Sequence, residues 1–338
     1  MNSDKIMNNY KQNKIIVFYN ELMCPHSLGE TTETPSPLKP KLLMDFLHKV
    51  GLDSHFLIDN NFTPFENKEF YLAHTREYVD GFFNGVPPYS NGNGLLGVEW
   101  DESFANSVRY TNSSLYNAIS GSINNPAQIY LSPTSGFHHA VPEQGALFCA
   151  FSGQVISAIK IYQDYKMSGA FIDLDGHFGN SIEDSRSFVK NLDLAIPKGC
   201  NINIKTKHSE YLEDLKIRFL ILQELILENK VHYVVFCHGA DSHEEDDIGS
   251  QLNTSEWIEC AEMFCKWVLK IENIIGRSLP VSLSLFGGYR IDDFESVLSL
   301  HTASLIKVLS MLSNIKIEYI PRVSINKRKQ GLRGNISS

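Results

Sequence analysis

The densest group of side chains that could do chemistry lies in residues 169–181, GAFIDLDGHFGNS. An apolar run leads into Asp173, Asp175 and His177, which alternate along the chain and so point to one side where it is extended. Parallel sheets keep their active sites at the carboxyl ends of strands, and carboxylates and imidazoles are common zinc ligands. The segment therefore predicts Asp175 and His177 as ligands of one metal, with Asp173 just behind them. Such a run can also simply cap a loop.

A third candidate ligand, Asp241, follows another apolar run, VHYVVFC, in residues 231–237. A glycine and an alanine directly precede it, so the backbone can turn close to whatever Asp241 binds. Together with Asp175 and His177 it would supply two oxygens and one nitrogen and leave a position open for water. That combination predicts a catalytic metal site, whereas Asp241 alone would be an ordinary turn residue.

Three further side chains could handle protons. His138 and His139 follow the strand-like sequence QIYLS in a loop, and imidazole exchanges protons near neutral pH. Tyr289 follows Gly287 and Gly288 at the end of the apolar run VSLSLF. The glycines allow a sharp turn that aims the phenol over the sheet edge, where it can donate to a developing oxyanion. In isolation both motifs would be ordinary loop features.

The elements that must position these residues follow a βα pattern. Short apolar or β-branched runs alternate with long amphipathic stretches, which predicts one three-layer αβα domain with a mainly parallel central sheet. The predicted strands are KIIVFY, GAFIDLD, VHYVVFC, VSLSLF and IKIEYI, and the predicted helices span 104–122, 144–167, 209–229, 254–275 and 291–313.

Composition predicts an ordinary globular protein with short ends. We expect a flexible tail at 1–12, a catalytic domain at 13–325 and a flexible basic tail at 326–338. No run reaches the roughly 18 apolar residues of a membrane span, and the start lacks a secretory signal. The expected location is therefore cytoplasmic, or outside the cell without a classical signal peptide.

Charge and cysteine usage exclude other classes. The formal net charge of -9 argues against a nucleic-acid binder, which needs a basic face. The 6 cysteines contain no CxxC pair, so we predict reduced packing residues instead of a zinc finger or a disulfide framework.

Residues 92–97 match GxGxxG, but no strand precedes them, so a flexible surface loop is expected. The acidic residues 244–247 could attract a cationic substrate or simply face solvent.

The four segments, in this order and spacing, resemble the histone deacetylase and acetylpolyamine amidohydrolase family between about residues 15 and 320. Weaker similarities are LAHTREYVDGFF near the N-terminus and GALFCAFSGQVISAI after the histidine pair. The resemblance implies an arginase-like α/β fold and a metal-dependent enzyme that removes an acyl group, acetyl in the first place, from an amine. Acyl-lysine in proteins and acetylated polyamines are the substrates that it implies.

The resemblance also implies roles for individual residues. One Zn²⁺ per chain would be held by Asp175, His177 and Asp241, while His139 would serve as general base and then as general acid. A second set would assist: His138 beside the metal, Asp173 as its orienting partner, and Tyr289 as the group that polarises the amide carbonyl. The backbone near Asp173 resembles the family's site for a monovalent cation such as K⁺.

Three positions depart from the family pattern. Phe178 stands where the family often has a second histidine after the metal-binding one. Asn180 replaces the carboxylate that usually backs the general-base histidine, and an amide stabilises an imidazolium less, so His139 should have a lower pKa than in an Asp-backed pair. The substrate channel is only partly evident: Phe148 is the candidate wall residue, with Gly287 and Gly288 beside it.

Two alternative functions remain open on these residues. A binuclear manganese ureohydrolase of the arginase kind shares the fold but needs further carboxylate and histidine ligands, and Phe178 stands where one would be expected. A non-catalytic module that binds acyl-lysine would usually have lost Tyr289 or a metal ligand, and this chain has kept them. The oligomeric state is not predicted.

Overall fold

The structure is a computed structural model that describes residues 10–30 and 32–329. Within these residues, seven strands form one all-parallel sheet in the order β2-β1-β3-β7-β6-β4-β5. β4, β6 and β7 are buried along their whole length, as expected for strands covered on both faces. The strands are β1 (Ile15–Phe18), β2 (Phe56–Asp59), β3 (Ile129–Ser132), β4 (Gly169–Asp173), β5 (Asn201–Asn203), β6 (Tyr233–Cys237) and β7 (Val281–Ser284).

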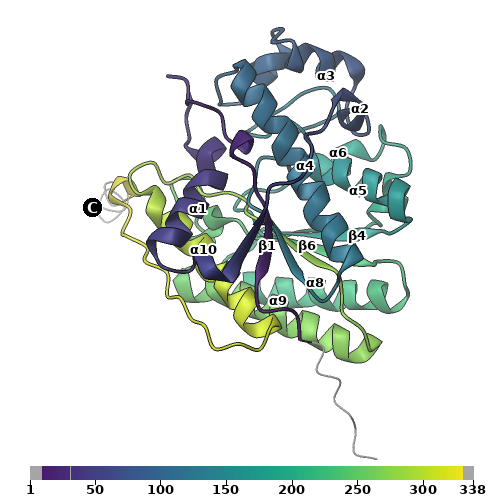
Figure 1. Cartoon of the computed structure of the whole chain (residues 1–338), viewed down its shortest axis with the longest axis vertical. Coiled ribbons are helices and arrows are strands. Elements are labelled where there is room, and N and C mark those ends of the chain that lie inside the picture. Colours follow the sequence, from purple (N-terminus) through teal and green to yellow (C-terminus); the bar gives the residue numbers. More distant parts are fainter. Residues whose placement is uncertain (1–9, 31, 330–338) are drawn as a thin grey trace, which may run out of the picture.

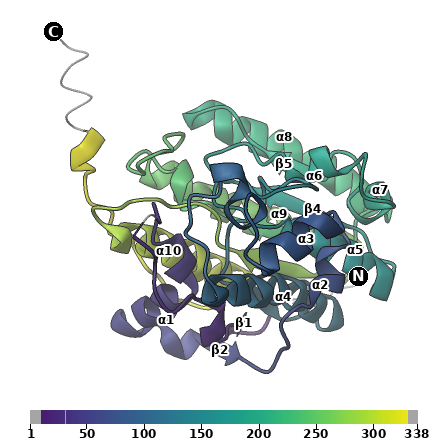
Figure 2. The same ribbon diagram turned by 90° about the horizontal axis from the view of Figure 1, so that it is seen from above.

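Helices cover both faces of the sheet, so the predicted αβα architecture is confirmed. Right-handed crossovers place connections that run toward β5 on one face and those that run toward β2 on the other. Figures 1 and 2 show α4 and α5 on one side and α1 and α10 on the other. The longer helices are α1 (Lys39–Lys49), α3 (Arg76–Phe83), α4 (Glu102–Asn124), α5 (Gly153–Tyr165), α8 (His208–Leu227), α9 (Thr254–Ile275) and α10 (Phe294–Leu312); the short ones are α2 (Asn67–Phe70), α6 (Ser181–Ser185) and α7 (Leu192–Ala195).

The register of the central strands brings their carboxyl ends level. Asp173 at the end of β4 pairs with Cys237 of β6, and Cys237 pairs with Ser284 of β7. Ser284 in turn pairs with Ser132 at the end of β3. The loops that follow these four strands therefore leave the sheet side by side, and they carry the candidate residues identified above.

Two sequence predictions of secondary structure are wrong. Residues 144–152 are irregular, and α5 begins only at Gly153, because Leu147 and Phe148 adopt left-handed φ values of 48° and 65°. The run IKIEYI at 315–320 is irregular and pairs with no described strand. Its alternate residues Ile315, Ile317 and Tyr319 pack on the core instead, so an alternating pattern here reflects packing on helices.

The domain extends beyond both predicted boundaries within the described residues. Lys11 is buried, its Nζ lies 2.9 Å from Glu272 Oε1, and it donates to the carbonyl oxygens of Pro126 and Leu279. At the other end Asn326 is fully buried and bonded to the loop after β6. The rest of the predicted tails, 1–9 and 330–338, lies outside the described residues.

The prediction for the cysteines agrees with the structure. All six cysteines are free and buried, as packing residues should be. Among the described helices, none has the length and apolar character to cross a membrane.

Candidate active site

Asp175, His177 and Asp241 come together at the carboxyl end of the sheet. One potential ligand atom from each lies within 4.8 Å of the others. His177 Nδ1 is 3.2 Å from Asp175 Oδ1 and 2.9 Å from Asp241 Oδ2. The structure thus assembles the three predicted ligands from the loops after two neighbouring strands, β4 and β6.

The electrostatics of this cluster fit a bound cation. Both aspartates are buried, and Asp241 Oδ1 has no hydrogen-bond partner among the described residues. Burial raises the pKa of Asp241, and the nearby charge of Asp175 raises it further. Hydrogen bonds to the two carboxylates raise the pKa of His177 to about 10, so this point attracts positive charge. A divalent metal would relieve two buried like charges and engage the orphaned oxygen.

His138 makes the contact predicted for a histidine oriented by Asp173. Its Nδ1 lies 3.0 Å from Asp173 Oδ2, and its Nε2 lies 3.7 Å from Asp175 Oδ1. Burial disfavours the imidazolium, but the charges of Asp175 and Asp173 outweigh burial and raise the pKa of His138 to about 9. His138 is therefore a cationic group beside the candidate metal ligands.

His139 has the opposite character although it is the next residue. Its Nδ1 lies 3.0 Å from Asn180 Oδ1, the amide predicted to back it. Burial and the charge of His138 together lower its pKa to about 4, and the Asn180 contact opposes them only in part. The predicted difference between an Asn-backed and an Asp-backed histidine stays a prediction. A neutral imidazole at neutral pH is the form that can accept a proton.

The turn Gly287–Gly288–Tyr289 carries the phenol to the same place. Gly287 has φ of 50°, and a side chain there would place its Cβ 1.7 Å from Asp241 Oδ1, so only glycine fits behind this ligand. The Tyr289 ring lies 6.1 Å from that of His177. Burial, together with the charges of Asp175 and Asp241, raises the pKa of Tyr289, so its hydroxyl keeps a proton to donate.

Phe148, the predicted wall residue, lies beside Tyr289, in a cavity whose lining includes none of the candidate metal ligands. Its ring lies 5.3 Å from that of Tyr289, and both side chains line one cavity. The loop at 92–97 holds Phe148 from behind: Leu96 O accepts its backbone N–H, and a Cβ on Gly97 would meet its ring. That loop, expected to be merely flexible, therefore supports the site. Gly287 and Gly288 pack against Asp241 and Val297 and do not line this cavity.

Two residues near the site were missed by sequence reasoning. Lys39 at the start of α1 is fully buried, donates to Gly287 O and lies 3.3 Å from Ser135 Oγ. Burial lowers its pKa to about 8 despite the carboxylates of Asp241 and Asp175 nearby. Asp246 is buried and accepts from the backbone N–H of Tyr289. Lys39 carries no recognisable signal, and Asp246 was read only as one charge of an acidic run.

Comparison with known proteins identifies this arrangement. Residues 34–192 match the histone deacetylase domain. The resemblance to the histone deacetylase family is therefore confirmed over this part of the chain. The match covers both histidines and the segment after β4, while Asp241 and Tyr289 join them through the fold.

A solved structure supports the fold over nearly the whole chain. The crystal structure of the HDA15 HD domain superposes on this chain with a TM-score of 0.65 and 14% sequence identity. The alignment covers 95% of this chain and 93% of the other. The chain therefore has that fold over nearly its whole described length. The domain match supports a deacetylase-type hydrolase in general terms.

Proposed function

We propose that this protein is a zinc-dependent amidohydrolase that removes an acyl group, acetyl in the first place, from an amine. One observation carries the proposal: the ring of His177 lies 6.4 Å from that of His139 and 6.1 Å from that of Tyr289. A proton acceptor and a proton donor thus flank the same Asp/His/Asp cluster. General acid–base chemistry at an amide needs both groups within reach of one reacting carbonyl.

The residues of the cluster suit zinc in a catalytic site. Asp175, His177 and Asp241 would hold it with two oxygens and one nitrogen, which leaves a position for water or substrate. When bound, the ion supplies Lewis acidity, which acidifies water and polarises the substrate carbonyl.

The chain's own residues then move the protons. His139 Nε2 accepts a proton from the attacking water, and the Tyr289 hydroxyl donates a hydrogen bond to the carbonyl oxygen as negative charge develops on it. His138, held cationic by Asp173 and Asp175, adds electrostatic stabilisation to the same charge. His139 finally returns its proton to the leaving nitrogen as the C–N bond breaks. The products are a carboxylate and a free amine.

We infer that the amine is a lysine side chain in a protein or a polyamine. The family match supports an acylated amine as substrate. The wall formed by Phe148 beside Tyr289 supports a slender aliphatic chain next to the reacting carbonyl. Both substrate classes present such a chain between the amide nitrogen and the rest of the molecule.

Metal analysis combined with a substrate panel tests the proposal. We expect one zinc per chain and hydrolysis of acyl-lysine peptides or acetylpolyamines that a hydroxamate chelator blocks. Two metals per chain with urea-forming activity would point to the ureohydrolase alternative. Tight binding of acyl-lysine without turnover by the metal-loaded protein would point to the binding module, and either result would reject the deacylase.

Tyr289→Phe tests the proton donor at this centre. Loss of one oxyanion donor costs about 10²–10³-fold in kcat. We expect a fall of that size with the metal content unchanged, because the ring and its packing on Phe148 persist. Unchanged kinetics would remove Tyr289 from the mechanism.

A further inference from the structure

Most carboxylates of the acidic run, residues 244–247, accept hydrogen bonds from backbone N–H groups. Asp246, which is 2% exposed, accepts the N–H of Tyr289 at 2.8 Å through Oδ2 and that of Ile248 at 3.1 Å through Oδ1. Asp247 Oδ2 accepts the N–H of Ile291 at 3.1 Å. The acidic run therefore binds the backbone at Tyr289 and at Ile291.

These hydrogen bonds hold a turn whose backbone would otherwise have unusual conformational freedom. Gly287 and Gly288 both have left-handed φ values, 50° and 96°, and glycines leave the backbone more freedom than other residues do. The direction of the Tyr289 ring depends on the backbone that follows this turn. Hydrogen bonds that N–H groups donate to ionised carboxylates are about twice as strong as hydrogen bonds between neutral groups. Asp246 and Asp247 thus limit the freedom of the turn on both sides of the ring.

The same loop carries a candidate metal ligand. Asp241 lies five residues before Asp246, and Ala240 N–H donates to Phe286 O at 3.1 Å, just before the glycine turn. Gly249 packs against the Asp241 carbonyl so closely that no side chain fits there. One compact loop therefore fixes both the ligand Asp241 and the backbone of Tyr289, which sets the phenol relative to the metal cluster.

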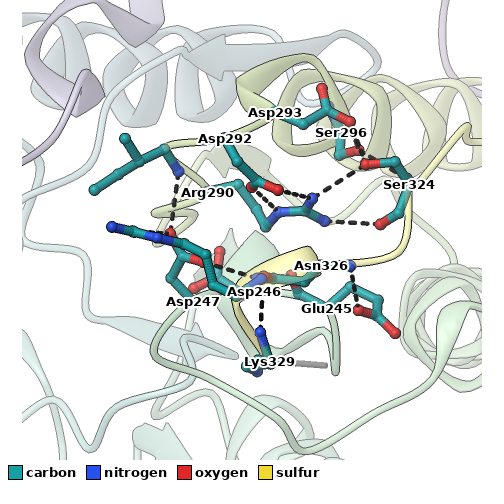
Figure 3. A network of polar contacts seen from close by, with 12 residues as sticks. Glu245, Asp246, Asp247, Arg290, Asp292, Asp293, Ser296, Ser324, Asn326 and Lys329 are labelled. Carbon is teal, nitrogen blue, oxygen red and sulfur yellow. Dashed lines mark hydrogen bonds and ion pairs between the residues drawn. The ribbon is translucent and has the colours of Figure 1, made fainter. Parts of the chain in front are cut away.

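The C-terminal segment, residues 324–329, is hydrogen-bonded to this loop, as Figure 3 shows. Asn326 donates from its backbone N–H to Glu245 Oε2 at 2.8 Å and from Nδ2 to Asp247 Oδ1 at 2.7 Å. Lys329 Nζ donates to the carbonyl oxygens of Glu244 and Gly249 at 2.9 and 2.6 Å. Asn326 is fully buried, so its side chain has little freedom to leave.

Arg290 joins the segment to the turn itself. It is the residue after Tyr289, and its guanidinium donates to Ser324 O at 2.8 Å and to Asp292 Oδ1 at 2.8 Å. Its side chain is 2% exposed, so the guanidinium has little freedom to leave Ser324 and Asp292 (Figure 3). The C-terminal segment thus contacts the acidic loop through Asn326 and the Tyr289 turn through Arg290.

We infer that Asp246 and Asp247 are positioning residues for Tyr289 and that Asn326 and Lys329 keep them in place. The inference rests on the proposed role of the Tyr289 hydroxyl. It assigns Asp246 and Asp247 to the catalytic geometry and gives the C-terminal segment a part in turnover, although this segment lies far from the other site residues in the sequence.

A double-mutant cycle tests whether Asp246 acts through Tyr289. Asp246→Asn keeps the shape but replaces one acceptor oxygen with a donor, so one of the two backbone bonds is lost. We expect kcat to fall about 10–100-fold with KM little changed, as for a displaced catalytic group. In the Tyr289→Phe background the same substitution should cost less than about 3-fold, because the group that it positions is gone. Equal losses in both backgrounds would overturn the inference.

Two further variants bracket this result. Asn326→Ala, which leaves the loop itself intact, should lower kcat about 5-fold, as expected for the loss of a buried hydrogen bond. Glu244→Gln is the matched control, because it removes a charge from the same run while its carbonyl still accepts from Lys329. We expect its kcat within about 2-fold of the parent protein. A fall in kcat for Glu244→Gln as large as for Asp246→Asn would contradict specific positioning.

Hydrogen exchange separates this inference from the proposed function. In the full chain, the peptide that contains Tyr289 and Ile291 should exchange slowly, and Asp246→Asn should speed its exchange while helices α8 and α9 stay protected. This readout needs no substrate. If the parent protein hydrolyses no acyl amide, the proposed function fails. If the amides of Ile248 and Tyr289 both stay protected in Asp246→Asn, the positioning inference fails whatever the activity.

Discussion

Two acidic segments follow neighbouring strands, and they do different things. After β4, Asp173 and Asp175 face imidazoles: Asp173 contacts His138 at 3.0 Å and Asp175 contacts His177 at 3.2 Å. After β6, Asp246 and Asp247 face backbone N–H groups of the Tyr289 turn. Residue type and strand position are shared, yet one set surrounds a cation site and the other fastens a loop.

The difference lies in what the carboxylate oxygens meet. Both side-chain oxygens of Asp246 accept N–H donors, which oppose in part the rise in its pKa that burial causes. Asp241 Oδ1 meets no donor within the described structure, and Asp241 lies against Asp175. A buried carboxylate with an unpaired oxygen beside another carboxylate is stabilised by a bound cation or by a proton. The role of an acidic residue therefore follows from its partners and not from the local density of charge.

The sharpest way to break this comparison is to neutralise one aspartate of the candidate metal cluster and one aspartate that holds the Tyr289 turn. Asp241→Asn should abolish metal binding and lower kcat/KM by at least about 10³-fold, because the metal supplies several kcal/mol of transition-state stabilisation. Asp246→Asn should keep its full metal content. The measurement is zinc per chain by mass spectrometry, beside kinetics on the same preparations.

A circular dichroism spectrum guards against a trivial result from Asp241→Asn. The folded variant should match the parent spectrum, since Gly287 and the backbone around residue 241 tolerate an amide of equal size. Full zinc content in folded Asp241→Asn would refute the assignment of the ligand set. Loss of zinc from Asp246→Asn would erase the distinction between the two acidic segments.

The metal-ligand set was within reach of the sequence. Asp175, His177 and Asp241 each follow an apolar strand within a few residues, and parallel strands deliver such positions to one edge. The pairings of His138 with Asp173 and of His139 with Asn180 came from the family resemblance, and the contacts are present. Short-range patterns and a regular fold are enough for features of this kind.

The rest depends on contacts that no local pattern encodes. Asp246 meets Tyr289 across 43 positions and Asn326 meets Asp247 across 79, so nothing near either residue reveals its partner. The irregular turn at Leu147 and Phe148 is set by hydrogen bonds to Leu95 O and Leu96 O, which override an apolar pattern that looked helical. Long-range hydrogen bonds were thus the main source of error.

The two adjacent histidines repeat the comparison at smaller scale. His138 has a carboxylate partner and a pKa raised to about 9, whereas His139 has an amide partner and a pKa lowered to about 4. Asn180→Asp should raise the pKa of His139 by about 1–2 units, because a carboxylate favours the imidazolium. The base must be neutral to accept a proton, so the acidic limb of the kcat/KM profile should move to higher pH.

This variant needs a companion substitution. Asn180 Nδ2 donates to Asp184 Oδ2 at 2.5 Å, so a carboxylate at 180 would repel Asp184. The pH profile is therefore best measured for Asn180→Asp combined with Asp184→Asn, with Asp184→Asn alone as the control. An unmoved acidic limb in the double variant would show that His139 does not set it.

The smallest expected effect tests whether the acidic run also recruits a cationic substrate. The side chains of Glu245, Asp246 and Asp247 are bonded to the Asn326 segment and the Tyr289 turn, so little charge is left to face solvent. Glu244→Gln should therefore change KM for an acetylpolyamine by less than about 2-fold, since a half-exposed charge is screened by salt. The measurement is KM at low and high ionic strength for the parent and the variant. A several-fold rise in KM that appears only at low salt would mean that the acidic run attracts substrate as well as holding Tyr289. Both acidic segments would then act through their charge, and their roles would differ less than their contacts indicate.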